Sequence, residues 1–134
     1  MLDFKGMKTE DFKNVIKIIE ELDNTNLDVN LSLTGNTIFM MSPTQETELY
    51  IKKSLNSIII SRVNFYNKRK GIMTKVLKEL INITKGYGCN KIIVESVLTK
   101  EMSQFCLKNK FIKKPNYFGE FDEGYIGDYE LILD

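Results

Sequence analysis

The sequence predicts a mixed α+β fold, with an antiparallel first half and one parallel crossover in the second half. Apolar residues recur at helical spacing over residues 8–22, and apolar and polar residues alternate over residues 27–33. Further along, a strand pattern ending at Asn64 is followed by a helical pattern and then by the apolar strand Lys91 to Leu98. A strand, a crossover helix and a second strand form a right-handed parallel βαβ unit.

The first half is typical of a helix followed by an antiparallel meander. Thr9 is expected to cap the helix, whose apolar stripe includes Phe12 and Ile19. Turn residues such as Gly35-Asn36 separate the strand patterns that follow. The expected elements are a short strand at Leu2 to Phe4, the helix Lys8 to Leu22, and strands at 27–33, Thr37 to Met41, Glu48 to Lys53 and Ser57 to Asn64.

The second half begins with a basic turn. Gly86 and Gly88 are expected to end the crossover helix, because glycine readily adopts the left-handed conformation at helix ends. Pro115 weakens the strand pattern around it, because proline donates no backbone hydrogen bond. The expected elements are the helix Gly71 to Lys85, the strand Lys91 to Leu98, a helix at Lys100 to Asn109, and strands at Phe111 to Phe118 and Tyr129 to Leu133.

Length and composition favour one globular domain over residues 1–134. The chain has 134 residues, of which 43% are hydrophobic and 28% are charged, ordinary values for a globular protein. The formal net charge of +1 provides no global field, so we expect neither nucleic acid nor a membrane as a partner. Residues Met1 to Lys5 lack a signal-peptide pattern and no apolar run approaches a membrane span, so we expect a cytoplasmic location.

The chain contains no histidine and two cysteines, Cys89 and Cys106. Histidine is the commonest general base and metal ligand, so Ser-His-Asp mechanisms, Cys-His mechanisms and two-histidine zinc sites are excluded. A CxxC pair is absent as well. Carboxylate sites for magnesium are not excluded, but no metal is expected.

A basic glycine turn carries most of the functional information. A strand ends near Val63, three cations follow at 68–70, and Gly71 opens a helix. Backbone N–H groups at a helix start attract anions, and the helix dipole adds to this attraction. Gly71 would let a phosphate approach the backbone closely. On charge alone, a solvated basic turn is an equally good interpretation.

This turn resembles the acyl-CoA-binding motif of the GNAT superfamily, V-x-x-x-x-[RQ]-x-x-G-x-[GA]. Val63 and Gly71 match the pattern. Lys68 stands at the Arg/Gln position and Met73 at the Gly/Ala position. The order of elements is similar over nearly the whole chain. The resemblance implies a central mixed sheet of about six or seven strands, with an antiparallel first half, one parallel βαβ crossover with splayed strands, and helices on both faces.

The resemblance also implies a binding mode for acetyl-CoA, the expected cosubstrate. Pantetheine would lie between the two splayed strands and bond to the backbone of the first. Backbone N–H groups at the helix start would hold most of the pyrophosphate. The residues implied for pantetheine are Arg62, Val63 and Asn64, and those for the pyrophosphate are Lys68, Arg69, Lys70, Gly71, Ile72 and Met73.

A second stretch resembles the family motif N-x-x-A-x-x-[FL]-Y-x-K-x-G-F. Phe105, Lys108 and Phe111 match, whereas Cys106 occupies the position of the tyrosine that often protonates the departing CoA thiolate. The Cys106 thiol is the candidate general acid, and a small packed residue is the alternative. Tyr117, Tyr125 or a water could also supply the proton, or the thiolate could leave unassisted.

The candidate general base is Glu95, which interrupts the apolar strand near the expected splay. A carboxylate buried there would have a raised pKa and could take a proton from an amine. A solvated strand end, or a pair with a lysine, is an equally weighted alternative. A backbone N–H near Val63 or Asn64 would hold the oxyanion of the tetrahedral intermediate.

The implied function is an N-acetyltransferase, in which a primary amine attacks acetyl-CoA directly in a ternary complex. The alternative is a degenerate GNAT domain that binds CoA, or a protein partner, without catalysis. The sequence does not identify the amine acceptor, which could be a small molecule or a protein. The sequence does not predict the oligomeric state, which could be a monomer or a homodimer.

Overall fold

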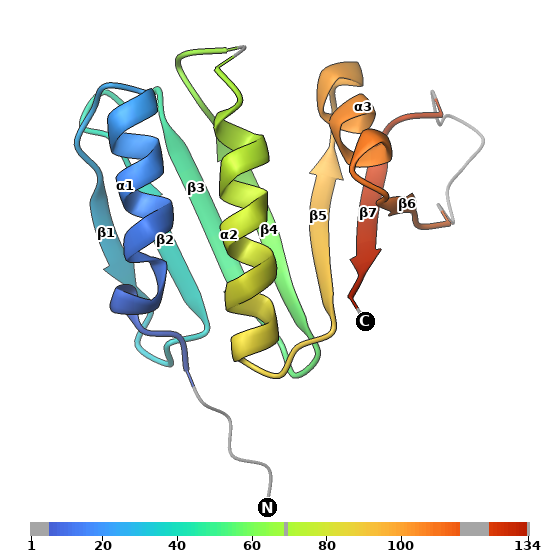
Figure 1. Ribbon diagram of the computed structural model, residues 1–134, viewed down its shortest axis with the longest axis horizontal. Coiled ribbons are helices and arrows are strands. Elements are labelled where there is room, and N and C mark those ends of the chain that lie inside the picture. Colours follow the sequence, from blue (N-terminus) through green and yellow to red (C-terminus); the bar gives the residue numbers. More distant parts are fainter. Residues whose placement is uncertain (1–5, 69, 116–123, 134) are drawn as a thin grey trace, which may run out of the picture.

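The computed structural model describes residues 6–68, 70–115 and 124–133, which form a seven-stranded sheet with helices packed on it (Figure 1). The expected strand at Leu2 to Phe4 lies outside these residues. The elements are η1 (Thr9–Phe12), α1 (Lys13–Leu22), β1 (Asp28–Leu31), β2 (Thr37–Met41), β3 (Glu48–Lys53), β4 (Ser57–Asn64), α2 (Ile72–Gly86), β5 (Lys91–Val97), α3 (Lys100–Lys108), β6 (Ile112–Lys113) and β7 (Gly127–Ile132).

The strand order of the sheet is β1-β2-β3-β4-β5-β7-β6. Strands β4 and β5 pair in parallel and are joined by α2, whereas the other neighbouring strands are antiparallel. The predicted antiparallel half and the single βαβ crossover are therefore confirmed, and the fold is a mixed α+β fold. None of the helices in the described ranges is long and apolar enough to cross a bilayer.

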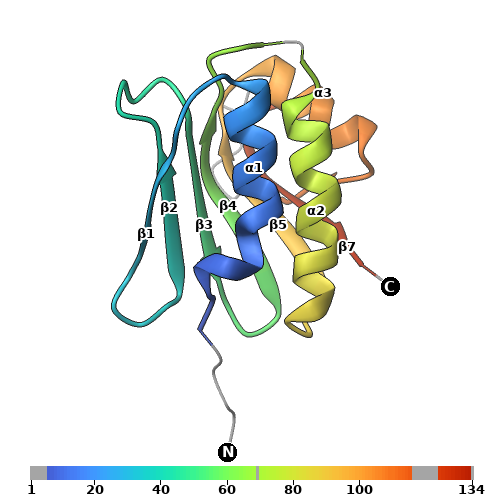
Figure 2. The same cartoon turned by 60° about the vertical axis from the view of Figure 1, so that its left-hand side comes forward.

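The described α-helices all cover the same face of the sheet (Figures 1 and 2). Val94 on β5 pairs with Ile60 on β4 and with Tyr129 on β7, and paired residues point to the same face. The hydroxyl groups of Tyr129 and Ser103 lie 2.6 Å apart, which places α3 on the face that α2 covers. The expectation of helices on both faces is therefore wrong for the described part of the chain.

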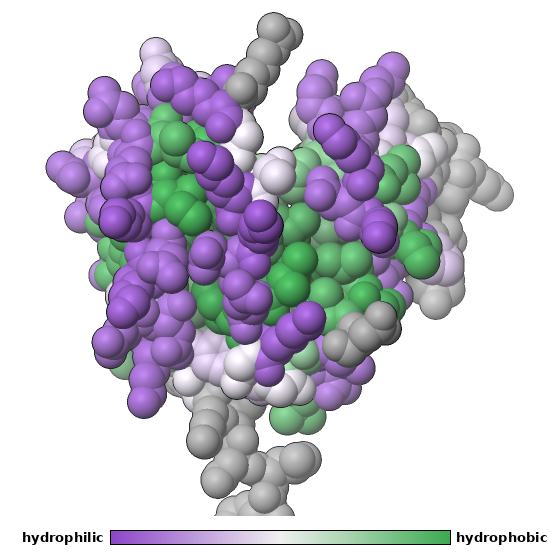
Figure 3. Space-filling view, viewed as in Figure 1, coloured by the Kyte–Doolittle hydropathy of each residue, from purple (hydrophilic) through white to green (hydrophobic). Residues whose placement is uncertain are grey.

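The core lies between the sheet and this single layer of helices. Strands β2, β3, β4 and β5 contribute alternate side chains, as the strand periodicity predicts, and the helices contribute their apolar stripes. The fully buried members of this core include Phe12, Val15, Ile19, Ile38, Met40, Leu49, Ile51, Ile58, Val76, Leu80 and Ile92. Figure 3 shows further hydrophobic side chains at the surface beside α2, on the side toward α3.

Local hydrogen bonds move some of the predicted boundaries. Thr9 does not cap a helix that begins at Lys8: a 3₁₀ turn comes first, with an Asp11 N–H to Lys8 C=O bond of 3.1 Å, and α1 begins at Lys13. The first strand stops at Leu31, because the turn up to Asn36 begins at Ser32, and Leu33 is fully exposed. Strand β6 has only two residues, and the rest of its predicted length is partly outside the described residues.

Candidate functional site

Strands β4 and β5 pair in parallel only as far as Ile60 and Val94, and then separate. Beyond this pair, β4 continues to Asn64 and β5 to Val97 without partners between them. The separation opens on the side of the sheet where α2 begins (Figure 1). The structure therefore contains the expected splay, bounded by the backbone edges of two strands.

A β-bulge lies on each strand at the point where the two separate. On β4, Ile60 pairs with Ile51 and Arg62 with Tyr50, so Ser61 is the extra residue. The Ser61 hydroxyl bonds to the carbonyl of Tyr50 at 3.3 Å. A bulge bends the strand that carries it and increases its twist. The bulge therefore turns the end of β4 away from β5.

The bulge on β5 falls at Glu95 and Ser96, opposite Asp128 on β7. Ser96 has a φ of 54°, an uncommon conformation for a residue with a side chain. Its backbone N–H donates a 2.8 Å hydrogen bond to Oδ1 of Asp128. The carboxylate stabilises the left-handed backbone at Ser96 and so fixes the direction in which Glu95 projects.

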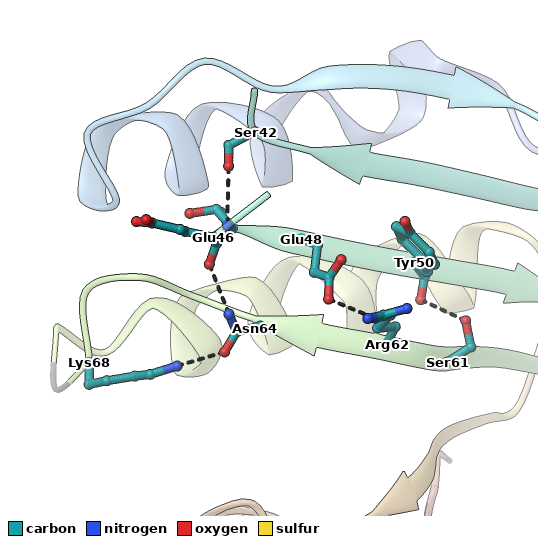
Figure 4. A network of polar contacts seen from close by, with 9 residues as sticks. Ser42, Glu46, Glu48, Tyr50, Ser61, Arg62, Asn64 and Lys68 are labelled. Carbon is teal, nitrogen blue, oxygen red and sulfur yellow. Dashed lines mark hydrogen bonds and ion pairs between the residues drawn. The ribbon is translucent and has the colours of Figure 1, made fainter. Parts of the chain in front are cut away.

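The side chains of Arg62 and Asn64 bond to neighbouring protein groups along β3 and β4 (Figure 4). Arg62 Nε lies 2.6 Å from Glu48 Oε1, and its guanidinium lies 5.9 Å from the centre of the Tyr50 ring. Asn64 Nδ2 donates to the carbonyl of Glu46 at 2.8 Å. Val63 is half-buried between them. In this arrangement the groups of β4 that a ligand in the splay can reach are those of the backbone, not these side chains.

Gly71 adopts the left-handed conformation, with a φ of 69°, at the start of α2. The Lys75 N–H donates to the Gly71 carbonyl at 3.1 Å, as the first helical hydrogen bond. The N–H groups of Gly71, Ile72, Met73 and Thr74 therefore have no partner within the helix. Apart from its chain neighbours, a Cβ on Gly71 would meet no described atom within 4 Å, so the glycine is needed for the left-handed backbone conformation and not for lack of space.

The other residues predicted around the pyrophosphate divide, where the structure describes them, into two groups. Lys68 and Lys70 are exposed, and Lys68 Nζ lies 2.8 Å from Asn64 Oδ1. Ile72 is buried, and the partly buried Met73 packs against the core, so their side chains do not cover these N–H groups, which are free of partners within the helix. Arg69 lies outside the described residues.

Asp23 is hydrogen-bonded to the turn between β4 and α2. It was not predicted as a site residue from the sequence. It follows α1 directly and is buried. Its Oδ2 accepts a 2.9 Å bond from the N–H of Tyr66, and its Oδ1 a 2.6 Å bond from the N–H of Asn67. The Thr47 hydroxyl also donates to Oδ2. Nothing in the sequence pattern around Asp23 indicates contacts with residues more than twenty positions away.

The hydrogen bonds to Asp23 determine its charge state. Burial alone acts to raise the pKa of this carboxyl group, because it disfavours the charged form. The bonds from the Thr47 hydroxyl and from the N–H groups of Asn67 and Tyr66 outweigh burial and lower the pKa below its ordinary value. Asp23 is therefore an anion at neutral pH, fully engaged with donors of the protein.

The two candidate catalytic residues lie in different surroundings. The Glu95 side chain is one-third exposed, and its Oε1 lies 3.1 Å from Lys52 Nζ. Glu95 therefore forms the pair with a lysine that was one of the alternatives to a general base. Cys106 is completely buried in the core, and burial raises the pKa of its thiol to about 12. The surroundings of Cys106 favour the packed alternative, because a group without exposed surface does not reach a ligand.

The comparisons with known proteins address the fold. No protein-family model matches the chain, and no curated protein matches it in sequence. An acetyltransferase of the GNAT family from Staphylococcus aureus matches in structure with a TM-score of 0.55 and 15% identity, over 97% of this chain and 98% of that one. Ard1 from Thermoplasma volcanium matches with a TM-score of 0.55 and 10% identity, over 97% and 96% of the two chains.

A third structure has a ligand. The PaiA N-acetyltransferase from Thermoplasma acidophilum, in complex with coenzyme A, matches with a TM-score of 0.54 and 16% identity. The match covers 72% of this chain and 60% of that one. At these identities the likeness concerns the arrangement of the backbone. The chain has the fold of the GNAT acetyltransferases. Its own β4 and β5 form the splayed parallel pair that the sequence motif implies.

Proposed function

We propose that the protein transfers the acetyl group of acetyl-CoA to a primary amine. The observation that carries the proposal is the separation of β4 from β5 beside the N–H groups at the start of α2 that are free of partners within the helix. The pyrophosphate would bind to the N–H groups from Gly71 to Thr74, and pantetheine would run between the strands. A solved structure of the same fold binds coenzyme A, which supports this choice of cosubstrate.

Both ends of the proposed site suit parts of CoA. Lys68 and Lys70 place positive charge beside the free N–H groups, where two phosphates would lie. Partly buried hydrophobic residues of the elements around the splay provide an apolar surface for the pantetheine arm. These residues are Val63 on β4, Met73 on α2, and Met102 and Phe105 on α3.

In the proposed reaction a neutral amine attacks the thioester carbon directly. The new C–N bond forms as the carbonyl π electrons move to oxygen, and a β4 backbone N–H near Val63 or Asn64 would stabilise that oxyanion. Glu95, directly or through a water, would take the proton that the nitrogen loses. Because Glu95 bonds to Lys52, the carboxylate would exchange this exposed partner for the incoming amine or water.

Collapse of the intermediate breaks the C–S bond and releases the CoA thiolate. The buried Cys106 thiol, with its raised pKa, is poorly suited to donate a proton to it. We therefore propose that the thiolate leaves unassisted or takes its proton from water. The tyrosine of the family motif would have no functional substitute at position 106.

The alternative function is a domain that binds CoA without catalysis. The burial of Cys106 and the Lys52 partner of Glu95 favour this alternative, because neither candidate group stands free beside the splay. The two functions share the same CoA site and differ only in turnover.

Calorimetric titration with acetyl-CoA, followed by turnover assays with a panel of amines and peptides, separates the two functions. Binding with turnover supports the transferase, and binding without turnover supports the alternative. The control is Gly71→Glu, which puts a negative charge at the phosphate position in open space. This variant should lose CoA binding and remain folded, with a loss of about 1–2 kcal/mol of stability because a side chain at this positive φ is strained. A wild-type protein that does not bind acetyl-CoA, or an unchanged affinity in Gly71→Glu, would contradict the proposed site.

A further inference from the structure

We infer that Asp23 is a positioning residue for CoA: its carboxylate holds the first half of the β4–α2 turn, so that the second half presents free N–H groups to the pyrophosphate. The inference rests on the proposed CoA site and adds to it Asp23, the residue that follows α1. Asp23 itself would not touch the ligand. It would act through the backbone of Tyr66 and Asn67, to which it is bonded.

The turn between Asn64 and Ile72 is fixed in its first half by consecutive contacts. Phe65 is buried in the core. The N–H groups of Tyr66 and Asn67 both point to the Asp23 carboxylate, at 2.9 and 2.6 Å. Lys68 is bonded to Asn64 at 2.8 Å. The first half of the turn is therefore held in one conformation before any ligand arrives.

The second half of the turn depends on the first for its direction. Of the residues that the structure describes in this half, Lys70 and Gly71 are exposed, and a Cβ on Gly71 would meet no described atom within 4 Å. The direction of the N–H groups at the start of α2 is therefore set by α2 on one side and by residues 65–68 on the other. Binding is tighter when donors are already oriented, because the ligand does not have to order them.

A carboxylate is well suited to this position. It accepts hydrogen bonds through both oxygens and donates none, so one side chain can serve the Tyr66 and Asn67 N–H groups and the Thr47 hydroxyl together. Asp23 also follows α1 and contacts the segment before β3, so the turn is tied to two other parts of the fold. An amide in its place would turn an NH₂ group toward one of these donors.

The test compares Asp23→Asn with the matched control Thr47→Val. Asp23→Asn leaves one turn N–H facing an amide NH₂, whereas Thr47→Val removes a donor to the same carboxylate and keeps both bonds to the turn. Both variants should unfold at lower urea concentration than the wild type. Only Asp23→Asn should bind CoA about tenfold more weakly, a change that the loss of one charged hydrogen bond can produce.

Hydrogen exchange without ligand gives a second readout. In Asp23→Asn the backbone amides of Tyr66, Asn67 and the start of α2 should exchange faster, while Thr47→Val should leave their rates near the wild-type values. If Asp23→Asn does not fold, Asp23→Ser, whose hydroxyl can still accept one bond, replaces it in the comparison.

The failure of this inference can be told from the failure of the proposed function. If the wild type binds CoA and both variants bind it equally well, or both lose affinity alike, Asp23 is a structural residue and the inference is overturned. If the wild type does not bind CoA, the proposed function fails and the positioning role fails with it.

Discussion

Ser96 on β5 and Asp128 on β7 face each other at a β-bulge, which lies where β5 separates from β4. The Ser96 N–H donates to Asp128 Oδ1 at 2.8 Å, and Ser96 has a φ of 54°. A left-handed residue with a side chain costs about 1–2 kcal/mol, so the conformation persists because neighbouring groups hold it. Asp128 is such a group, and it lies opposite the bulge that Ser96 forms with the candidate base Glu95.

Replacing Asp128 should therefore affect both stability and turnover. We expect Asp128→Ala to lower the free energy of unfolding by about 1–3 kcal/mol, as expected for the loss of a charged acceptor. Because Glu95 would lose its fixed direction, kcat should fall by about tenfold while CoA affinity changes little. Urea denaturation and steady-state kinetics check the two effects. Asp128→Asn keeps one acceptor oxygen, so its stability and kcat should lie between those of the wild type and Asp128→Ala. Equal kcat values for the wild type and both variants would contradict this role of Asp128.

Glu95→Gln tests the proposed base directly. The amide cannot accept the amine proton, so kcat should fall by about 10²–10⁴ with unchanged CoA binding. Lys52→Met is the matched control, because it removes the 3.1 Å partner of Glu95 and leaves the carboxylate in place. The control should retain activity and lose at most about 1 kcal/mol of stability. Equal activity of Glu95→Gln and wild type would assign the proton transfer to another group.

Cys106→Ala should affect the core rather than the reaction. The residue is completely buried, and removal of its sulfur should lower the free energy of unfolding by about 1 kcal/mol. The kcat of the folded variant should stay within about twofold of the wild type. A large drop in kcat together with a change in its pH profile would restore Cys106 as the general acid.

The lowered pKa of Asp23 predicts a specific dependence of stability on pH. A carboxyl group whose pKa is lower in the folded protein stabilises it fully above the unfolded value of about 3.9, and this contribution is lost as the pH falls through the lower folded value. Urea denaturation from about pH 6 to about pH 2 should therefore show a steeper loss of stability in wild type than in Asp23→Asn. Parallel curves would show that Asp23 is not held as a bonded anion.

The elements that the sequence predicts well are those with a local signal. Alternation identified β1, turn residues separated the strand patterns of β2, β3 and β4, and Gly71 followed by an apolar stripe identified the start of α2. The backbone at position 71 has a left-handed φ at the start of a helix, and glycine adopts this conformation most easily. A glycine in the sequence therefore indicates this position. The splay was implied by the motif at Val63 and Gly71, and the parallel pairing does end at Ile60.

The features that the sequence does not predict depend on contacts between distant residues. Asp23 meets Tyr66 and Asn67 only because the end of α1 lies beside the β4–α2 turn in the folded chain. The bulge at Ser96 depends on Asp128, more than thirty residues away. The face that α3 covers is likewise set by a tertiary contact, between Ser103 and Tyr129, and no local pattern near α3 encodes it.

The central claim is that CoA binds where β4 and β5 separate, with its phosphates at the start of α2. The most direct measurement is a titration of ¹⁵N-labelled protein with CoA, followed by the backbone amide signals. The largest shifts should belong to Gly71, Ile72 and Thr74 and, on β4, to Val63 and Asn64. Largest shifts on β1 and β2, or no shifts at saturating CoA, would contradict the claim.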